Sequence, residues 1–143
     1  MACDLIIASD LAAFGLPEVG LGVIPGHGGT ARLADWVGSA RARELIFSGR
    51  RVKADEAERI GLANRVVPHD QLSVQTLELA QAIAAQSPTA VAAAKRALRS
   101  HRQAATDQAM ATETREFAAL FGSPDQQEGM AAFAEKRQPR FGR

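Results

Sequence analysis

The sequence predicts an α/β protein in which helices predominate and the strands come first. A short apolar run at residues 5–9 lies between two aspartates and is typical of a buried strand. From residue 29 onward, apolar residues recur at helical spacing in successive segments that end at glycine or before proline. The 143 residues, 46% of them apolar, are enough to form the core of one domain.

Strands are expected mostly in the first half of the chain. Besides residues 5–9, we expect extended segments around Phe14, at residues 19–22 and at residues 64–68. Each is a short apolar or β-branched run that lacks the length of a helix.

Two helices are expected directly after this region. Residues 30–38 present an apolar face and end at Gly38, a natural C-terminal cap. Residues 39–49 repeat the design, with Ser39 as the expected N-cap. The two segments therefore predict a helical hairpin.

The rest of the chain is expected to be helical. The predicted helices cover residues 53–62, 66–88, 88–100, 106–123 and 123–137. Ser87 is placed to cap the helix that begins at Pro88, and Ser123 or Asp125 lies near the start of the last helix.

The charge of the chain argues against nucleic acid and membrane partners. Its 17 basic and 16 acidic residues leave a net charge of +1, and no window approaches the roughly 20 apolar residues of a membrane span. One local basic cluster, without an acid, extends over residues 136–143 and contains Lys136, Arg137, Arg140 and Arg143.

The cysteine and histidine content predicts a cytoplasmic protein without a metal site. Cys3 is the only cysteine, so it cannot form an internal disulfide. The histidines His27, His69 and His101 do not have metal-ligand spacing. No signal peptide is expected, because acidic residues interrupt the apolar stretch at the N-terminus.

Residues 15–30, GLPEVGLGVIPGHGGT, are the segment most suggestive of a functional site. They hold six of the twelve glycines, two prolines and one carboxylate, Glu18. Glycine lets backbone N–H groups approach a ligand closely, and the segment leads into a helix whose first N–H groups are free to bind a polar oxygen. The spacing matches neither a phosphate loop nor a dinucleotide-binding fingerprint, and no GxSxG motif occurs.

The residues themselves leave the role of Glu18 open. A carboxylate in apolar surroundings suits proton transfer to carbon or water. A glutamate in a surface turn would have no chemical role. The spacing does not decide between these interpretations.

Four segments carry motifs that occur together in one enzyme family. They are ACDLIIAS at 2–9, FGLPEVGLGVIPGHGGTARL at 14–33, SGRRVKADEAERIGLANRVVP at 48–68 and DQQEGMAAFAEKRQPRF at 125–141. In order and spacing they resemble the C-terminal half of the enoyl-CoA hydratase/isomerase (crotonase) family. The resemblance implies part of a ββα spiral core with an active-site loop at residues 1–68, and a helical trimerisation region at residues 69–143.

The resemblance also implies catalytic roles for two residues. Glu18 resembles the family's second glutamate, which protonates the α-carbon in hydratases and moves a proton between carbons in isomerases. Gly26 resembles the glycine whose backbone N–H holds the catalytic water. Family members stabilise the charge on the thioester oxygen with two backbone N–H groups.

Further residues are implied to bind the substrate. Pro17 and Leu21 would line the substrate site. Phe133 and Lys136 resemble residues that meet the adenosine end of coenzyme A on a neighbouring subunit. The expected partner is an acyl-CoA thioester, in which coenzyme A is part of the substrate, so no separate cofactor is expected. The expected assembly is a homo-oligomer, either a trimer or a dimer of trimers.

The sequence departs from the family at the other side of the site. The first catalytic glutamate and both oxyanion-hole donors have no counterpart in it, so we expect a partial enzyme with negligible hydratase activity by itself. The leading interpretation is an enoyl-CoA hydratase-like protein that hydrates 2-enoyl-CoA thioesters. The alternatives are a double-bond isomerase of the same fold and a non-catalytic assembly fragment.

Overall fold

Two small sheets form within the first half of the chain in the computed structural model, which describes residues 1–100 and 103–142. Strand β1 (Ile7–Ser9) pairs in parallel with β4 (Arg65–Val67), with Ala8 opposite Val66. Strand β2 (Ala13–Phe14) pairs antiparallel with β3 (Val52–Lys53). His101 and Arg143, which the sequence analysis names, lie outside the described residues.

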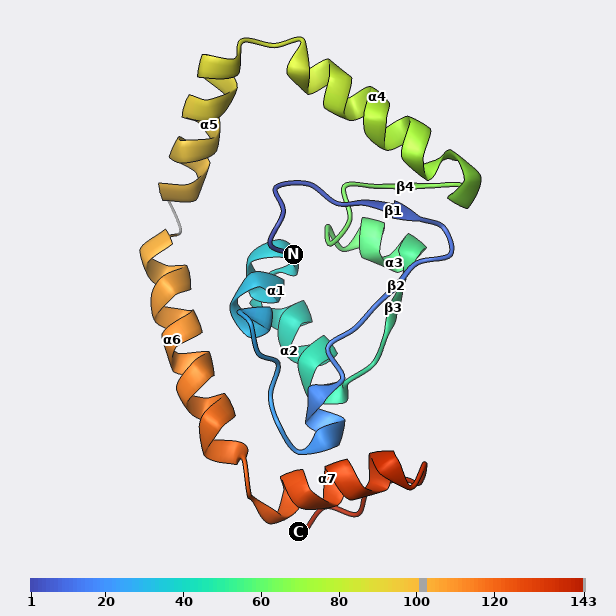
Figure 1. Ribbon diagram of the computed structural model, residues 1–143, viewed down its shortest axis with the longest axis vertical. Helices are drawn as coiled ribbons and strands as arrows, with labels where there is room; N and C mark the ends of the chain where they lie inside the picture. Colours follow the sequence, from blue (N-terminus) through green and yellow to red (C-terminus); the bar gives the residue numbers. More distant parts are fainter. Residues whose placement is uncertain (101–102, 143) are drawn as a thin grey trace.

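Helices make up most of the remaining structure. Helices α1 (Gly29–Val37), α2 (Ser39–Ser48) and α3 (Ala54–Arg59) lie beside the two sheets, and α1 and α2 form the predicted hairpin. Helices α4 (Leu72–Ala84), α5 (Pro88–Ser100), α6 (Gln103–Leu120) and α7 (Pro124–Ala134) then form an arc around this first part (Figure 1). Short 3-10 helices lie at η1 (Glu18–Leu21) and η2 (His69–Gln71).

The main hydrophobic cluster lies within the first part of the chain. Its buried residues come from both sheets and the first three helices or their ends, and are Ala8, Leu33, Val37, Ala42, Leu45, Ile46, Val52, Ala57, Leu62 and Ala63. Helix α4 has no buried residue, and α5 carries Leu98 with 76% of its surface exposed. Helix α4 contacts β1, α6 contacts α1, and α7 contacts η1.

Several predicted boundaries are confirmed by the capping geometry. The Ser87 hydroxyl accepts a hydrogen bond from the Ala90 N–H at 3.3 Å, and the Ser123 hydroxyl accepts one from the Gln126 N–H at 3.1 Å. Each serine therefore satisfies one of the free N–H groups of a helix start.

Two local predictions were wrong. Ser39 is the first residue of α2 and not its N-cap, because Gly38, with a φ of 80°, both ends α1 and begins α2. Residues 19–22 are not extended, because the segment turns between Pro17 and a left-handed Gly22 and forms η1. Strand β3 was not expected, since two residues are too few to show an alternating pattern.

Candidate active site

The Glu18 turn is held by its own backbone. The Pro17 carbonyl accepts the Gly20 N–H at 2.9 Å, and the Glu18 carbonyl accepts the Val23 N–H at 3.3 Å. The Glu18 side chain is half-buried, and its Oε2 atom is buried with no hydrogen-bond partner among the residues that the structure describes. A carboxylate oxygen away from water and without a donor is costly. This burial argues against a simple surface-turn glutamate.

Helix α7 fixes the same turn from outside through two glycines. A Cβ atom on Gly129 would lie 2.4 Å from the carbonyl carbon of Leu21, and one on Gly22 would lie 2.3 Å from the backbone carbonyl oxygen of Asp125. Any side chain at either position would therefore separate the two backbones. The sequence motifs EGMAAF and EVGLG thus meet in space, although they lie more than 100 residues apart.

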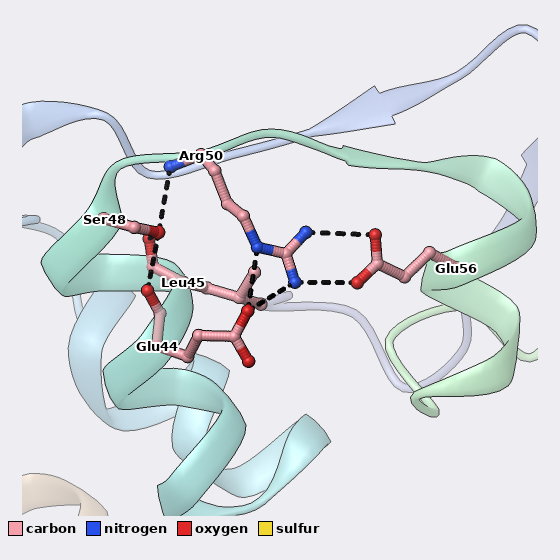
Figure 2. Close-up of polar contacts among 5 residues, drawn as sticks. All are labelled: Glu44, Leu45, Ser48, Arg50 and Glu56. Atoms are coloured by element: carbon pink, nitrogen blue, oxygen red, sulfur yellow. Dashed lines mark hydrogen bonds and ion pairs between the residues drawn. The ribbon is translucent and has the colours of Figure 1, made fainter.

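The turn after α2 supports η1 from the other side. A Cβ atom on Gly49 would be 3.4 Å from the Val19 side chain and 3.6 Å from the Cα of Pro17. Figure 2 shows how Arg50 anchors this turn: its guanidinium donates to both Glu56 oxygens at 3.0 and 2.7 Å and, through Nε, to Glu44 at 2.9 Å. These hydrogen bonds hold the pKa of the Glu56 carboxyl below its usual value and raise the pKa of Arg50.

The Gly26 loop leads into the start of α1. Pro25 is fully buried, whereas His27 is exposed and left-handed with a φ of 54°. The Gly26 carbonyl accepts the Gly29 N–H at 2.9 Å. Within residues 1–100 and 103–142, nothing accepts a hydrogen bond from the Gly26 N–H itself.

The acid that anchors this loop was missed by the sequence reasoning. Glu113, buried in α6, accepts hydrogen bonds from the N–H groups of Gly28 and Thr30. The sequence does contain a sign of this role. Glu113 lies three residues after Met110 and four before Phe117, so this carboxylate is on the apolar face of the predicted helix.

The residues implied to bind substrate lie in two places. Pro17 and Leu21 share the η1 turn with Glu18, where Pro17 is exposed and Leu21 is half-buried. Phe133 lies near the end of α7 with 72% of its surface exposed, and Lys136 lies just beyond it in a left-handed conformation. The structure therefore brings Pro17, Glu18 and Leu21 together. Phe133 and Lys136 lie four and seven residues after Gly129, which contacts Leu21.

Acids in α7 and just after it neutralise part of the basic cluster at residues 136–143. Arg137 pairs with Glu128 and with Glu135, both at 2.6 Å, and the Arg140 N–H also donates to Glu128 at 2.6 Å. The Arg137 guanidinium and then the Arg140 N–H lower the pKa of the Glu128 carboxyl to about 2. The Lys136 ammonium pairs with no carboxylate of the described residues.

Two negative findings concern the described part of the chain. None of its helices combines the length and the apolar composition needed to cross a bilayer. Nor does this part gather three or more histidine, cysteine, aspartate or glutamate side chains in a way that would hold a metal ion.

Known proteins match this fold along nearly the whole chain. The crystal structure of an enoyl-CoA hydratase from Mycobacterium avium subsp. paratuberculosis K-10 has a TM-score of 0.92 at 31% identity, covering 99% of this chain and 58% of that chain. The short-chain-enoyl-CoA hydratase of Clostridium acetobutylicum is 47% identical over 137 residues, which are 96% of this chain and 52% of that protein. The one from Clostridioides difficile is 47% identical over 133 residues, which are 93% of this chain and 86% of that protein.

These similarities define the class of the protein as an α/β protein of the crotonase fold. Residues 1–143 match the profile of the enoyl-CoA hydratase/isomerase family. The chain belongs to the enoyl-CoA hydratase/isomerase family. It spans about half the length of the curated relatives it matches, the Clostridioides difficile protein excepted.

Proposed function

We propose that this chain supplies the proton-transfer side of an enoyl-CoA hydratase site, which adds water across the α,β double bond of a 2-enoyl-CoA thioester. The observation that carries the proposal is the buried Oε2 of Glu18, which has no hydrogen-bond partner among the described residues. A substrate or a water bound beside it would supply the missing partner. The two clostridial relatives are named short-chain-enoyl-CoA hydratases, which supports the same reaction.

The proposed reaction divides the work between two groups. The Gly26 N–H holds the water whose oxygen bonds to the β-carbon. The electron pair of the double bond moves toward the thioester, and the α-carbon then takes a proton from the Glu18 carboxyl group. The proton released by the water restores that group, so the sum is the addition of one water. In this proposal the donors that stabilise the thioester oxygen come from outside these 143 residues.

The coenzyme A portion is proposed to bind between the η1 turn of one subunit and the end of α7 of a neighbouring subunit. Pro17 and Leu21 flank Glu18 on its turn, where they would contact the acyl group or the pantetheine arm. The exposed ring of Phe133 suits the adenine, and the ammonium of Lys136, which pairs with no carboxylate in the described part of the chain, suits a phosphate. Coenzyme A is then part of the substrate, no separate cofactor is needed, and a homo-oligomer would complete the site.

The test is the hydration of crotonyl-CoA by the purified chain, alone and co-expressed with the part of the Clostridium acetobutylicum relative that this chain does not match. Glu18→Gln keeps the size of the side chain but cannot exchange the proton, so it should lower kcat by about 10²- to 10⁴-fold. Glu116→Gln, at an exposed position of α6, is the matched control.

The products separate the alternatives. The hydrated thioester in either arm, with loss in Glu18→Gln only, supports the hydratase proposal. Migration of the double bond in 3-enoyl thioesters without any hydrated product would identify an isomerase. No reaction in either arm would contradict both, and would leave an assembly role.

A further inference from the structure

Glu113 is a buried carboxylate outside the motifs that mark the proposed site. It lies in the middle of α6, and 4% of its surface is exposed. Its Oε1 atom accepts the Gly28 N–H at 2.6 Å, and its Oε2 atom accepts the Thr30 N–H at 2.8 Å and the Thr30 hydroxyl. Both oxygens are therefore engaged by donors of a loop that lies more than 80 residues earlier.

The conformation of that loop needs support from outside. His27 and Gly28 are consecutive left-handed residues, with φ values of 54° and 76°, and a non-glycine residue rarely adopts this region. The Thr30 N–H belongs to the first turn of α1, and Gly28 is the residue directly before the helix. Neither N–H group has an acceptor within the helix. A carboxylate at this end also interacts favourably with the helix dipole.

Helix α6 contacts the loop with one face. Met110, Glu113 and Phe117 are spaced three and four residues apart, so they lie on the same side of the helix. The Met110 sulfur lies 3.1 Å from the position of a Cβ on Gly28, and the Phe117 ring lies 3.7 Å from that of a Cβ on Gly26. The Gly26 backbone is therefore fixed between this ring and the carboxylate that holds Gly28.

We infer that Glu113 is a positioning residue that sets the direction of the Gly26 N–H and thereby the place of the reacting water. The inference rests on the proposed function, in which Gly26 binds that water. Glu113 acts through the backbone of residues 26–30 and touches no substrate atom. All three groups that face it are donors, so a carboxylate satisfies them, whereas the NH₂ of an amide would point at a donor.

The test compares Glu113→Gln with Glu116→Gln, a residue of the same helix whose carboxylate is exposed and contacts Arg115 at 3.6 Å. Amide hydrogen exchange of Gly28 and Thr30 is measured by NMR on the free chain, together with the chemical shift of the Gly26 amide. Steady-state hydration of crotonyl-CoA is measured in the arm where the unmodified protein turns over. We expect Glu113→Gln to speed exchange about tenfold and to lower kcat about 10- to 100-fold, with KM within about twofold.

A second pair of variants guards against simple unfolding. Thr30→Val removes the hydroxyl donor but keeps the N–H, so it should lower kcat in the same direction by a smaller factor. Thr30→Ser keeps both donors and should retain the unmodified kcat. Equal effects of valine and serine would contradict a role for the hydroxyl contact.

The outcomes separate this inference from the proposed function. If the unmodified protein hydrates the thioester and folded Glu113→Gln has the kcat of the Glu116→Gln control, the positioning role is wrong and the hydratase proposal stands. If no protein hydrates the thioester, the proposed function fails. The NMR measurements on Glu113→Gln then test whether Glu113 positions the loop. An unchanged chemical shift of the Gly26 amide, together with unchanged exchange rates at Gly28 and Thr30, would overturn the inference.

Discussion

Gly129→Ala tests whether the close contact between α7 and η1 holds the Glu18 turn in place. The new Cβ would lie 2.4 Å from the Leu21 carbonyl carbon and 2.7 Å from both its Cα and its oxygen. Ordinary contacts begin at 3.4 Å, so one backbone must move by about 1 Å. Because all three neighbours are backbone atoms, no side chain can rotate away to make room.

The expected cost follows from two opposing effects. Overpacking destabilises a protein by about 1–3 kcal/mol, whereas alanine in a helix is favoured over glycine by about 0.5–1 kcal/mol. We therefore expect a net loss of about 1–2 kcal/mol in the free energy of unfolding, which lowers Tm by about 3–8 °C for a chain of this size. The displaced turn should also reduce any Glu18-dependent turnover.

Thermal and urea unfolding followed by circular dichroism measure this loss. Gly20→Ala is the matched control, because it lies in η1, its Cβ would meet no atom within 4 Å and its φ is not left-handed. It should change the stability by less than about 0.5 kcal/mol. If the Tm of Gly129→Ala equals or exceeds that of the unmodified protein, or if Gly20→Ala loses as much stability as Gly129→Ala, the contact does not hold the turn as we argue.

Three further predictions concern other parts of the molecule. Leu45→Ala removes a side chain that is 5% exposed from the core, and should cost about 2–5 kcal/mol in urea unfolding; a loss below 1 kcal/mol would mean that this core is loosely packed. Ser123→Ala removes the cap of α7 and should cost about 0.5–2 kcal/mol, whereas Ser123→Asp should retain the stability because it can cap as well. The pKa of Glu128 is lowered from 4.5 to about 2, so its contribution to the free energy of unfolding is fully present above pH 4.5 and is lost as the pH falls toward 2. The difference in stability between the unmodified protein and Glu128→Gln should therefore narrow over that range. A constant difference would contradict the pairing with Arg137.

Much of the architecture follows from local patterns in the sequence. The helices were predicted from periodicity and from their ends, because glycine, proline and serine have position-specific effects at caps. The parts predicted poorly are short. Strand β3 has two residues, and η1 was taken for an extended segment because a 3-10 turn of four residues has no periodicity.

The candidate site shows a similar division between local and long-range information. Glu18 and Gly26 were found because glycines, prolines and one acid are concentrated in a single window, and the resemblance to a family gave them roles. The division of the chain into residues 1–68 and 69–143 stays a prediction, and so do the roles of Glu18 and Gly26. Glu113 was missed because a single acid in a long helix has many ordinary explanations.

The sequence by itself determined most of the helices, the glycine-rich window and the family, because these depend on patterns within short segments of the chain. Only the tertiary structure decided which distant segments meet. It set Gly129 against Leu21, so that α7 holds the Glu18 turn, and it placed Glu113 at the start of α1. The physical reason is that such contacts depend on the path of the whole backbone, and a missing Cβ or a buried acid has meaning only once its neighbour is known.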